Sequence, residues 1–224
     1  MTVSIILITY NSWHVLPMFF KGLELADYPF SLYVVDNFSQ HQPDLDRVVS
    51  VGVMNNNNCR QISLIKNKEN LMYTKAANQG MIVADGELFL LMNPDCYGVD
   101  SGWLKKMIEY WEQYRPDVAG YKLVRPDLRE IEHAGAHAPG VHEGKGEQDN
   151  GQYDEPRELM RADQYVTGAC WMIAKTTIDK YGLLPEEHVH YASDREYCFN
   201  VRNNGGHIWY FPTKMVHMFG KSCL

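Results

Sequence analysis

The sequence predicts an α/β fold: a single Rossmann-like, mostly parallel sheet flanked by helices, with a smaller second half built onto it. Two observations lead to this class. Short apolar runs alternate with helical patterns through the first half of the chain, and polar residues follow nearly every run. Such alternation is typical of βαβ units, in which successive strands lie parallel. No Pro/Ser-rich linker divides the 224 residues, so we expect one continuous domain over residues 1–224.

Four apolar runs of the first half are predicted to be strands. Val3–Thr9 and Leu88–Met92 are rich in β-formers and uninterrupted, as expected of strands buried on both faces. In an open parallel sheet, ligands gather at the carboxyl ends of the strands. The other two strands are Leu32–Val35 and Ile62–Ile65, and the polar residues at the four ends are Thr9-Tyr10-Asn11, Asp36-Asn37, Asn67 and Asn93-Pro94-Asp95.

Three helices are predicted around this sheet. A pattern from Trp13 to Ala26 indicates one, and its Pro17 is tolerable only near the first turn. Residues Tyr73–Ala84 form a second, preceded by Asn70 as its opening polar residue. The third, Ser101–Tyr114, carries an apolar stripe at helical spacing, which predicts a face buried in the core.

The second half is less regular. Its long polar stretch 138–161 predicts a surface loop, and we expect this loop to become ordered when a ligand binds. Strands are expected over Val118–Val124, Glu130–His137, Gln164–Ala174 and His207–Phe211, and helices over Thr176–Tyr181 and Asp194–Asn203.

Composition excludes several classes of protein. The net charge of −7 provides no basic field for nucleic-acid phosphates, so no nucleic-acid partner is expected. The apolar runs are far shorter than the ~18–20 residues that a membrane helix needs. Five scattered cysteines without C-x-x-C spacing indicate reduced thiols, and we therefore expect a cytoplasmic protein.

Several polar residues at these ends suit ligand binding, and each has a simpler structural explanation. Asp95 and Asn93 offer oxygen ligands of the kind that hard divalent cations prefer, but they also suit a turn that ends a strand. The carboxylate of Asp36 could accept hydrogen bonds from a base or ribose, or form an Asx-turn. Near the start of the helix that Asn70 opens, Lys75 could face a diphosphate or lie on a solvated surface.

Two positions near the end of the chain carry similar alternatives. Ser193-Asp194-Arg195-Glu196 fits a capping box, with Ser193 as the N-cap and Asp194 at the first helical position. There the carboxylate form of Asp194 is favoured, so this side chain could serve as a general base. His217 could contact a metal or phosphate, or be a packed histidine.

Taken together and in this order, these segments resemble glycosyltransferase family 2 with a GT-A fold, in particular its rhamnosyltransferase-like branch. The resemblance covers nearly the whole chain. The matching segments are Val3–Asn11 (T-Y-N), Val34–Ser39 (V-V-D-N-x-S), Asn70–Gly80 (N-x-G-F-A-x-A-x-N-x-G), Leu91–Asp95 (L-N-P-D), Ile131–Gly135 (I-Q-H-A-G), Val166–Cys170 (V-x-G-A-x), Ser193–Glu196 (E-D-x-D) and Val216-His217 (V-x-H).

The resemblance implies an inverting, metal-dependent transfer of a sugar from a nucleoside-diphosphate sugar to a hydroxyl of a glycan acceptor. It implies a nucleotide-binding half over residues 1–98 and an acceptor-binding half over 99–224. Asp95 and His217 would hold Mn or Mg, and Asp194 would be the general base. The nucleotide sugar would contact Thr9, Tyr10, Asn11, Asp36, Asn37, Asn70, Lys75 and Asn93.

Departures from the motifs keep an alternative open. Ser193 replaces a Glu before the implied base, and Met72 replaces a common Gly, so a non-catalytic nucleotide-sugar or glycan-binding module remains a second hypothesis. A sugar nucleotidyltransferase is disfavoured, because Thr9-Tyr10-Asn11 leads into Ser12-Trp13-His14 rather than a G-x-G-T-R loop. The donor stays open among dTDP-, UDP- and GDP-sugars, with a lean towards a deoxyhexose such as rhamnose. The chain is also compatible with being one module of a larger polypeptide.

Overall fold

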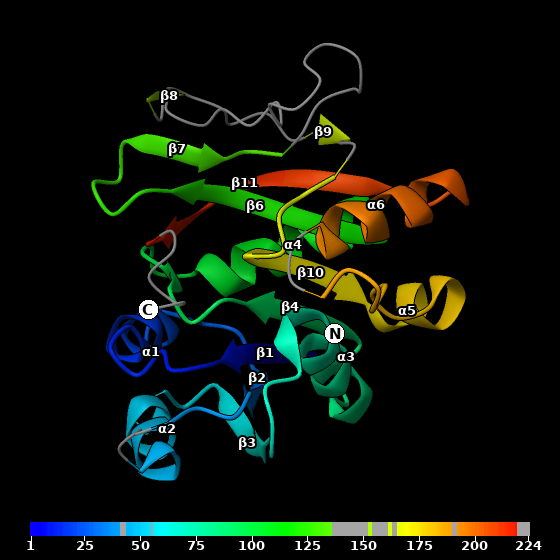
Figure 1. The fold of residues 1–224 in the computed structure, drawn as a ribbon. Helices are drawn as coiled ribbons and strands as arrows, with labels where there is room; N and C mark the ends of the chain where they lie inside the picture. Colours follow the sequence, from blue (N-terminus) through cyan, green and yellow to red (C-terminus); the bar gives the residue numbers. More distant parts are fainter. Residues whose placement is uncertain are drawn as a thin grey trace.

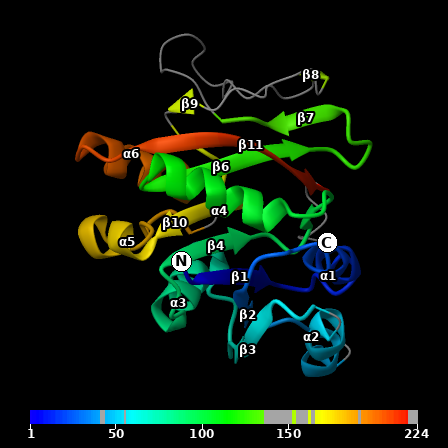
Figure 2. The ribbon, with the colours of Figure 1, turned by 180° about the vertical axis from the view of Figure 1, so that it is seen from behind.

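The structure is a computed structural model that describes residues 1–40, 44–54, 56–135, 152–153, 161–162, 165–189 and 192–218. Strands from both halves of the sequence join one sheet, and helices cover both of its faces (Figures 1 and 2). Helices α1, α2 and α4 lie on one face, and α3, α5 and α6 lie on the other. This arrangement confirms the α/β class that the sequence predicts.

The elements follow one another in the order strand, helix, strand through the first half, as the alternation of patterns indicates. The strands are β1 (Val3–Thr9), β2 (Phe30–Asp36), β3 (Cys59–Lys66), β4 (Leu88–Met92), β5 (Cys96–Gly98), β6 (Val118–Val124), β7 (Glu130–His133), β8 (Gln152–Tyr153), β9 (Arg161–Ala162), β10 (Cys170–Ala174) and β11 (Ile208–His217). The helices are α1 (Leu16–Leu23), α2 (Leu45–Val53), α3 (Met72–Val83), α4 (Trp103–Tyr114), α5 (Lys175–Tyr181) and α6 (Ser193–Asn203).

The order of strands across the sheet explains how the two halves are joined. The main path runs β3-β2-β1-β4-β10-β6-β11-β5. The first four strands are parallel to one another. Strand β10 then pairs antiparallel with both β4 and β6, while β11 runs parallel to β6. The antiparallel β10 therefore joins the two halves into one continuous sheet.

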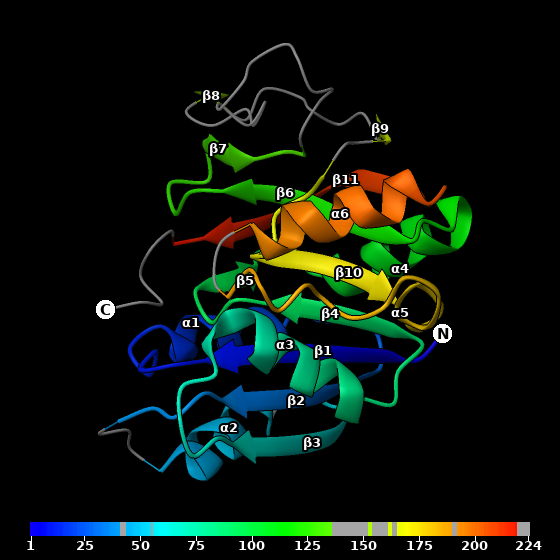
Figure 3. The same ribbon diagram turned by 45° about the vertical axis from the view of Figure 1, so that its right-hand side comes forward.

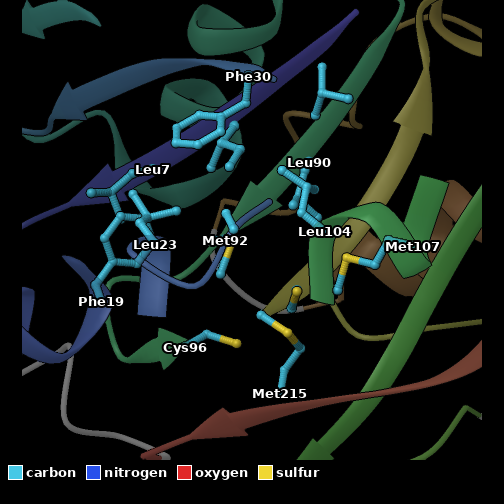
Figure 4. Close-up of a cluster of buried hydrophobic side chains, with 14 of the residues drawn as sticks. Leu7, Phe19, Leu23, Phe30, Leu90, Met92, Cys96, Leu104, Met107 and Met215 are labelled. Carbon is cyan, nitrogen blue, oxygen red and sulfur yellow. The ribbon is translucent and has the colours of Figure 1, made fainter. Parts of the chain in front are cut away.

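The core lies on both faces of this sheet, because side chains alternate along each strand. In β1, Ile5 and Leu7 face one cluster while Ile6 and Ile8 face the other. Figure 4 shows part of the first cluster, in which Leu7 and Leu90 of neighbouring strands lie near Phe19 of α1 and Met107 of α4. Strand β1 is buried throughout, as an uninterrupted apolar run predicts.

Most predicted elements are present, with shifted ends. Strands β1, β4 and β6 have the predicted limits, whereas α1 is shorter than the expected range 13–26 and contains Pro17 in its first turn. Strand β7 ends at His133 and β10 begins only at Cys170. The loop expected over 138–161 lies outside the described residues, apart from Gln152–Tyr153 and Arg161.

The prediction that Ser193 caps its helix is wrong. Ser193 is the first residue of α6, and the N-cap is Ala192, whose φ of 69° places it in the left-handed region. No side chain caps the helix at this end. Asp194 is consequently the second helical residue rather than the first, although it still lies in the first turn.

The asparagine that was expected to open α3 also lies outside that helix. Leu71 is the N-cap, and Asn70 precedes it. In the part of the chain that the structure describes, no helix has both the length and the hydropathy needed to cross a membrane.

Candidate active site

Several predicted site residues lie at the edge of the sheet where its parallel strands end. Strands β1, β2, β3, β4, β6 and β11 point the same way and β10 points the opposite way (Figure 3). The carboxyl ends of β1, β2, β4 and β11 therefore share an edge with the amino end of β10. Thr9 and Asp36 end β1 and β2, Asp95 follows β4, and His217 ends β11.

The loops after β1 and β2 are locked to each other. The backbone N–H of Asn11 donates to Ser39 Oγ at 2.8 Å, and Asn11 Oδ1 accepts from the N–H of Gln40 at 2.7 Å. Asp36 Oδ1 accepts from the N–H of Ser39, three residues on, at 3.2 Å, so this side chain holds its own loop, although not through an Asx-turn, which would reach the residue two positions on. The buried Thr9 Oγ1 at the end of β1 has no hydrogen-bond partner among the described residues.

Asn37 ties this edge to the segment that leads into α3. Its Nδ2 donates to Asn70 Oδ1 at 2.7 Å and to the carbonyl of Met72 at 3.2 Å. Its Oδ1 accepts from Asn67 Nδ2 at 3.1 Å and from the N–H of Leu71 at 2.9 Å. The side chain is buried and its amide is fully used, so Asn37 holds the loop in place rather than presenting free groups.

A buried carboxylate–imidazole–carboxylate cluster lies further along the edge. His217 Nε2 is 3.3 Å from Asp95 Oδ1, and His217 Nδ1 is 2.7 Å from Glu132 Oε2. Burial by itself lowers the pKa of His217, but the hydrogen bonds to Asp95 and Glu132 outweigh it and raise the pKa to about 10. His217 is thus an imidazolium near neutral pH, and its charge compensates part of the charge of the two acids.

Asp194 is oriented by two backbone groups. Its Oδ2 accepts from the N–H of Gly168 at 2.7 Å, and its Oδ1 accepts from the N–H of Arg195 at 2.8 Å. The phenol of Tyr73, from α3, donates to the carbonyl of Gly168 at 2.9 Å. Burial raises the pKa of Tyr73 far above its usual value, and the charge of Asp194 adds to the rise, so this phenol stays protonated and remains a donor.

The segment Thr167–Ala169 connects the two acidic positions. The Ala169 carbonyl accepts from the N–H of Asn93, two residues before Asp95, at 2.9 Å. The preceding residue, Gly168, donates its N–H to Asp194 Oδ2. The N–H of Thr167 donates to His133 Nε2 at 3.2 Å, on the strand that also carries Glu132. A short chain of hydrogen bonds therefore links the surroundings of Asp95 to those of Asp194.

The remaining predicted residues are exposed. Tyr10 and Asn70 are exposed at the surface. Lys75 is also exposed on α3, and no hydrogen bond or ion pair to another described residue fixes it. Met72 is exposed beside them with a φ of 61°, a left-handed conformation in which the glycine common in the resembling motif carries no steric cost.

Three contacts at the site involve residues to which the sequence reasoning gave no role: Glu132, Tyr73 and Gly168. Each belongs to a motif that was recognised, so the signal was present. Their contacts join positions 85, 95 and 26 residues apart in the sequence, and no periodicity in the sequence relates such positions.

The donors near Asp95 fit one part of a cation site. A carboxylate oxygen and an imidazole nitrogen 3.3 Å apart are close enough for one ion to contact both, since metal–ligand bonds are roughly 2.0–2.2 Å long. Within the described ranges, no group of three or more His, Cys, Asp or Glu residues is arranged to hold a metal ion. A cation here would need further ligands, and the phosphates of a substrate commonly supply them.

Comparison with known proteins shows which protein family the chain matches. The family model described as "Glycosyl transferase family 2" matches residues 4–182. That range runs from the second residue of β1 to beyond β10 and includes Asp95, and it ends before Asp194 and His217. No curated protein sequence gives a significant match to the chain.

Solved structures share the fold at low sequence identity. S. aureus TarS superposes with a TM-score of 0.66 at 20% identity, over 97% of this chain and 36% of that one. The mannosyltransferase PcManGT from Pyrobaculum calidifontis, in complex with GDP-Man and Mn²⁺, gives 0.69 at 16% identity, over 96% and 56%. GalNAc-T7 with UDP, GalNAc and Mn²⁺ gives 0.71 at 13%, over 96% and 43%. The chain thus spans between about a third and just over half of the length of these proteins.

Proposed function

The chain belongs to glycosyl transferase family 2, and on that premise we propose that it transfers a sugar from a nucleoside-diphosphate sugar to a hydroxyl of a glycan acceptor. In this proposal Asp95 and His217 take part in binding Mn²⁺ or Mg²⁺, and Asp194 is the general base of an inverting reaction. Neighbours of similar fold include complexes with UDP-GlcNAc and with GDP-Man and Mn²⁺, which supports a nucleotide-sugar donor.

The observation that carries the proposal is the hydrogen-bonded segment Thr167–Ala169. It contacts Asn93 on the side of Asp95 and holds Asp194 through Gly168. In the proposal, the carboxylate of Asp95 would serve the donor and that of Asp194 the acceptor. Two acids with separate surroundings at one edge are what a reaction with a departing diphosphate and an entering hydroxyl requires.

The residues of the chain divide the work of such a reaction. Loops that carry Asn11, Asp36 and Asn37 are rigid enough to orient a nucleotide against the ends of β1 and β2. A cation at Asp95 would neutralise charge that develops on the diphosphate. Such an ion would have to displace the proton of His217 before it could contact Nε2.

Asp194 would accept the proton of the attacking hydroxyl. The N–H groups of Gly168 and Arg195 each use one lone pair of its oxygens and fix the plane of the carboxylate, which leaves acceptor capacity for a hydroxyl. The oxygen of that hydroxyl then attacks the anomeric carbon as the bond to the diphosphate breaks. A single displacement inverts the anomeric centre and requires no covalent intermediate on the protein.

A panel of dTDP-, UDP- and GDP-sugars with Mn²⁺ tests the proposal. We expect at least one donor to raise the melting temperature and to be turned over, with release of nucleoside diphosphate. Asp95→Asn should lose Mn²⁺-dependent binding. Asp194→Asn should still bind the donor but turn it over about 10²–10⁴-fold more slowly, which is the usual contribution of a general base.

The exposed Asp100, five residues after Asp95, offers a matched control, and Asp100→Asn should behave like the wild type. Full turnover by Asp194→Asn would remove the base assignment. Donor binding without any turnover by the wild-type chain, across a panel of glycan acceptors, would favour the non-catalytic binding module instead.

A further inference from the structure

Glu132 is the buried acid of the site for which the proposed reaction has no use. Both of its oxygens approach His217 Nδ1, at 2.7 and 2.9 Å, and the residue is only 8% exposed. From this contact we infer that Glu132 is a positioning residue for the cation site. It holds the ring of His217 so that Nε2 faces Asp95, and it thereby sets the affinity of the site for a divalent cation. This inference rests on the proposed function.

The local backbone supports a dedicated role for this side chain. In the pairing of β6 with β7, Leu123 is opposite His133 and Val124 is opposite Ile131. The register therefore shifts by one residue at Glu132, which places this residue in a β-bulge. Bulges re-aim a side chain relative to the regular alternation of a strand, and they are frequent next to active sites.

The chemistry of histidine explains what the contact achieves. An imidazole has two distinct nitrogens, and the partner of one decides which way the other points and whether it can act as a ligand. Glu132 accepts from Nδ1, so Nε2 is the nitrogen left to face Asp95 at 3.3 Å. A carboxylate behind a histidine fixes its orientation and increases its basicity as a ligand, and loss of such a partner typically weakens metal binding about 10–100-fold.

The surrounding strands leave the ring little freedom to adopt another orientation. His217 is the last residue of β11, and it pairs across to Cys96, next to Asp95. Strand β6 lies between β11 and β7 and pairs with both. His217 and Glu132 are both buried, so water does not readily replace either partner. The acid and the ring are thus fixed relative to one another by the sheet.

Binding of Mn²⁺ in the presence of dTDP, of UDP and of GDP, measured from the electron paramagnetic resonance signal of the free ion, tests the inference. We expect Glu132→Ala to bind Mn²⁺ at least 10-fold more weakly than the wild type. Glu132→Gln should retain most of the affinity, within about 3-fold, because an amide oxygen still accepts from Nδ1 and keeps the ring oriented. If Glu132→Ala folds poorly, Glu132→Leu fills the same space without an acceptor and should show the same loss.

The same strand provides the control. Glu130 lies two residues before Glu132, is paired with Arg125 at 2.9 Å at the surface, and should tolerate Glu130→Ala without a change in Mn²⁺ affinity. A second readout, the ¹⁵N shift of His217 Nδ1, should differ from the wild type in Glu132→Ala, which removes the acceptor of that N–H, and should stay close to the wild type in Glu132→Gln.

The outcomes separate this inference from the function on which it rests. Wild-type affinity in both Glu132→Ala and Glu132→Leu would overturn the role of Glu132 while leaving the metal proposal standing. Equal losses in Glu132→Ala and Glu132→Gln would overturn a role through ring orientation. If the wild-type chain itself binds no Mn²⁺ with any of the three nucleotides, the metal part of the proposed function fails first, and the inference fails with it.

Discussion

At the scale of single residues, Met72 shows how a side chain can occupy a position that suits glycine. Its φ of 61° is costly for a residue with a Cβ, by roughly 1–2 kcal/mol. Glycine removes that cost but adds about 0.5–1 kcal/mol of backbone entropy to the unfolded chain. We therefore expect Met72→Gly to raise the free energy of unfolding by roughly 0.5–1 kcal/mol in urea titrations.

Met18 makes a matched comparison for this prediction, because it is about as exposed as Met72, 37% against 39%, but lies inside α1. Met18→Gly should lower the free energy of unfolding by about 1 kcal/mol. A loss of stability in both variants would show that the backbone at position 72 carries no strain.

Gly168 occupies a position beside Asp194 where a side chain would lie close to its neighbours. A Cβ built there would lie 3.3 Å from the Cβ of Asp194 and 3.3 Å from the phenol oxygen of Tyr73. In Gly168→Ala, Asp194 or Tyr73 would have to move by a few tenths of an ångström, so we expect a lower kcat, with a loss smaller than the roughly 10²-fold that a 1 Å misplacement costs. Steady-state kinetics with a donor found in the panel would measure this.

The effect of Gly168→Ala should vanish in an Asp194→Asn background, since it acts through that carboxylate. An equal loss in both backgrounds would mean that the alanine perturbs something other than Asp194.

At the scale of elements, Asn37 joins the end of β2 to the loop before α3. The four hydrogen bonds of its side chain include one from the backbone N–H of Leu71 and one to the carbonyl of Met72. Asn37→Ala would leave these groups without their partner, so we expect a loss of about 2 kcal/mol in the free energy of unfolding. Thermal and urea unfolding measure it, with Asn204→Ala, an exposed asparagine at the end of α6, as a near-neutral control.

If Asn37→Ala and Asn204→Ala were equally stable, the amide network would contribute nothing to holding the loop. Nucleotide binding should weaken together with stability in Asn37→Ala, because the loop that Asn37 holds lies at the predicted nucleotide edge.

The elements that the sequence predicted best are those whose signal is local. Strands β1, β4 and β6 are apolar runs bounded by turn residues, and their limits agree with the structure. Strand β11 was expected to end at Phe211. The strand continues to His217, and its register shifts between Phe211 and Lys214, where Pro212 lies. The short β5 is held by its pairing with β11, and no local sequence pattern predicts that pairing.

The site follows the same division. Polar residues at strand ends were found from sequence, because parallel strands bring their carboxyl ends together. The capping box at Ser193 failed because Ala192 adopts a left-handed conformation and becomes the N-cap instead. The contacts of Glu132 with His217 and of Gly168 with Asp194 arise from the packing of distant strands and helices, which the sequence does not display locally.

At the scale of the whole molecule, one continuous sheet joins the two halves of the chain. Strand β10 pairs with β4, and the segment before it, Thr167–Ala169, lies between the two acidic positions. Side chains anchored on one sheet keep their spacing better than those on separate loops. A chain of net charge −7 also gains little affinity for a diphosphate without a cation, which fits metal dependence.

Paramagnetic NMR tests most directly whether Asp95 and Asp194 serve one ligand. With UDP or GDP bound, Mn²⁺ at Asp95 should broaden the amide signals of Gly168 and Arg195, the two groups that hold Asp194, relative to Mg²⁺. The amides of Gly86 and Lys175, at the opposite end of β4 and β10, should stay sharp. Saturated Mn²⁺–nucleotide binding that leaves Gly168 and Arg195 unbroadened would contradict a shared site.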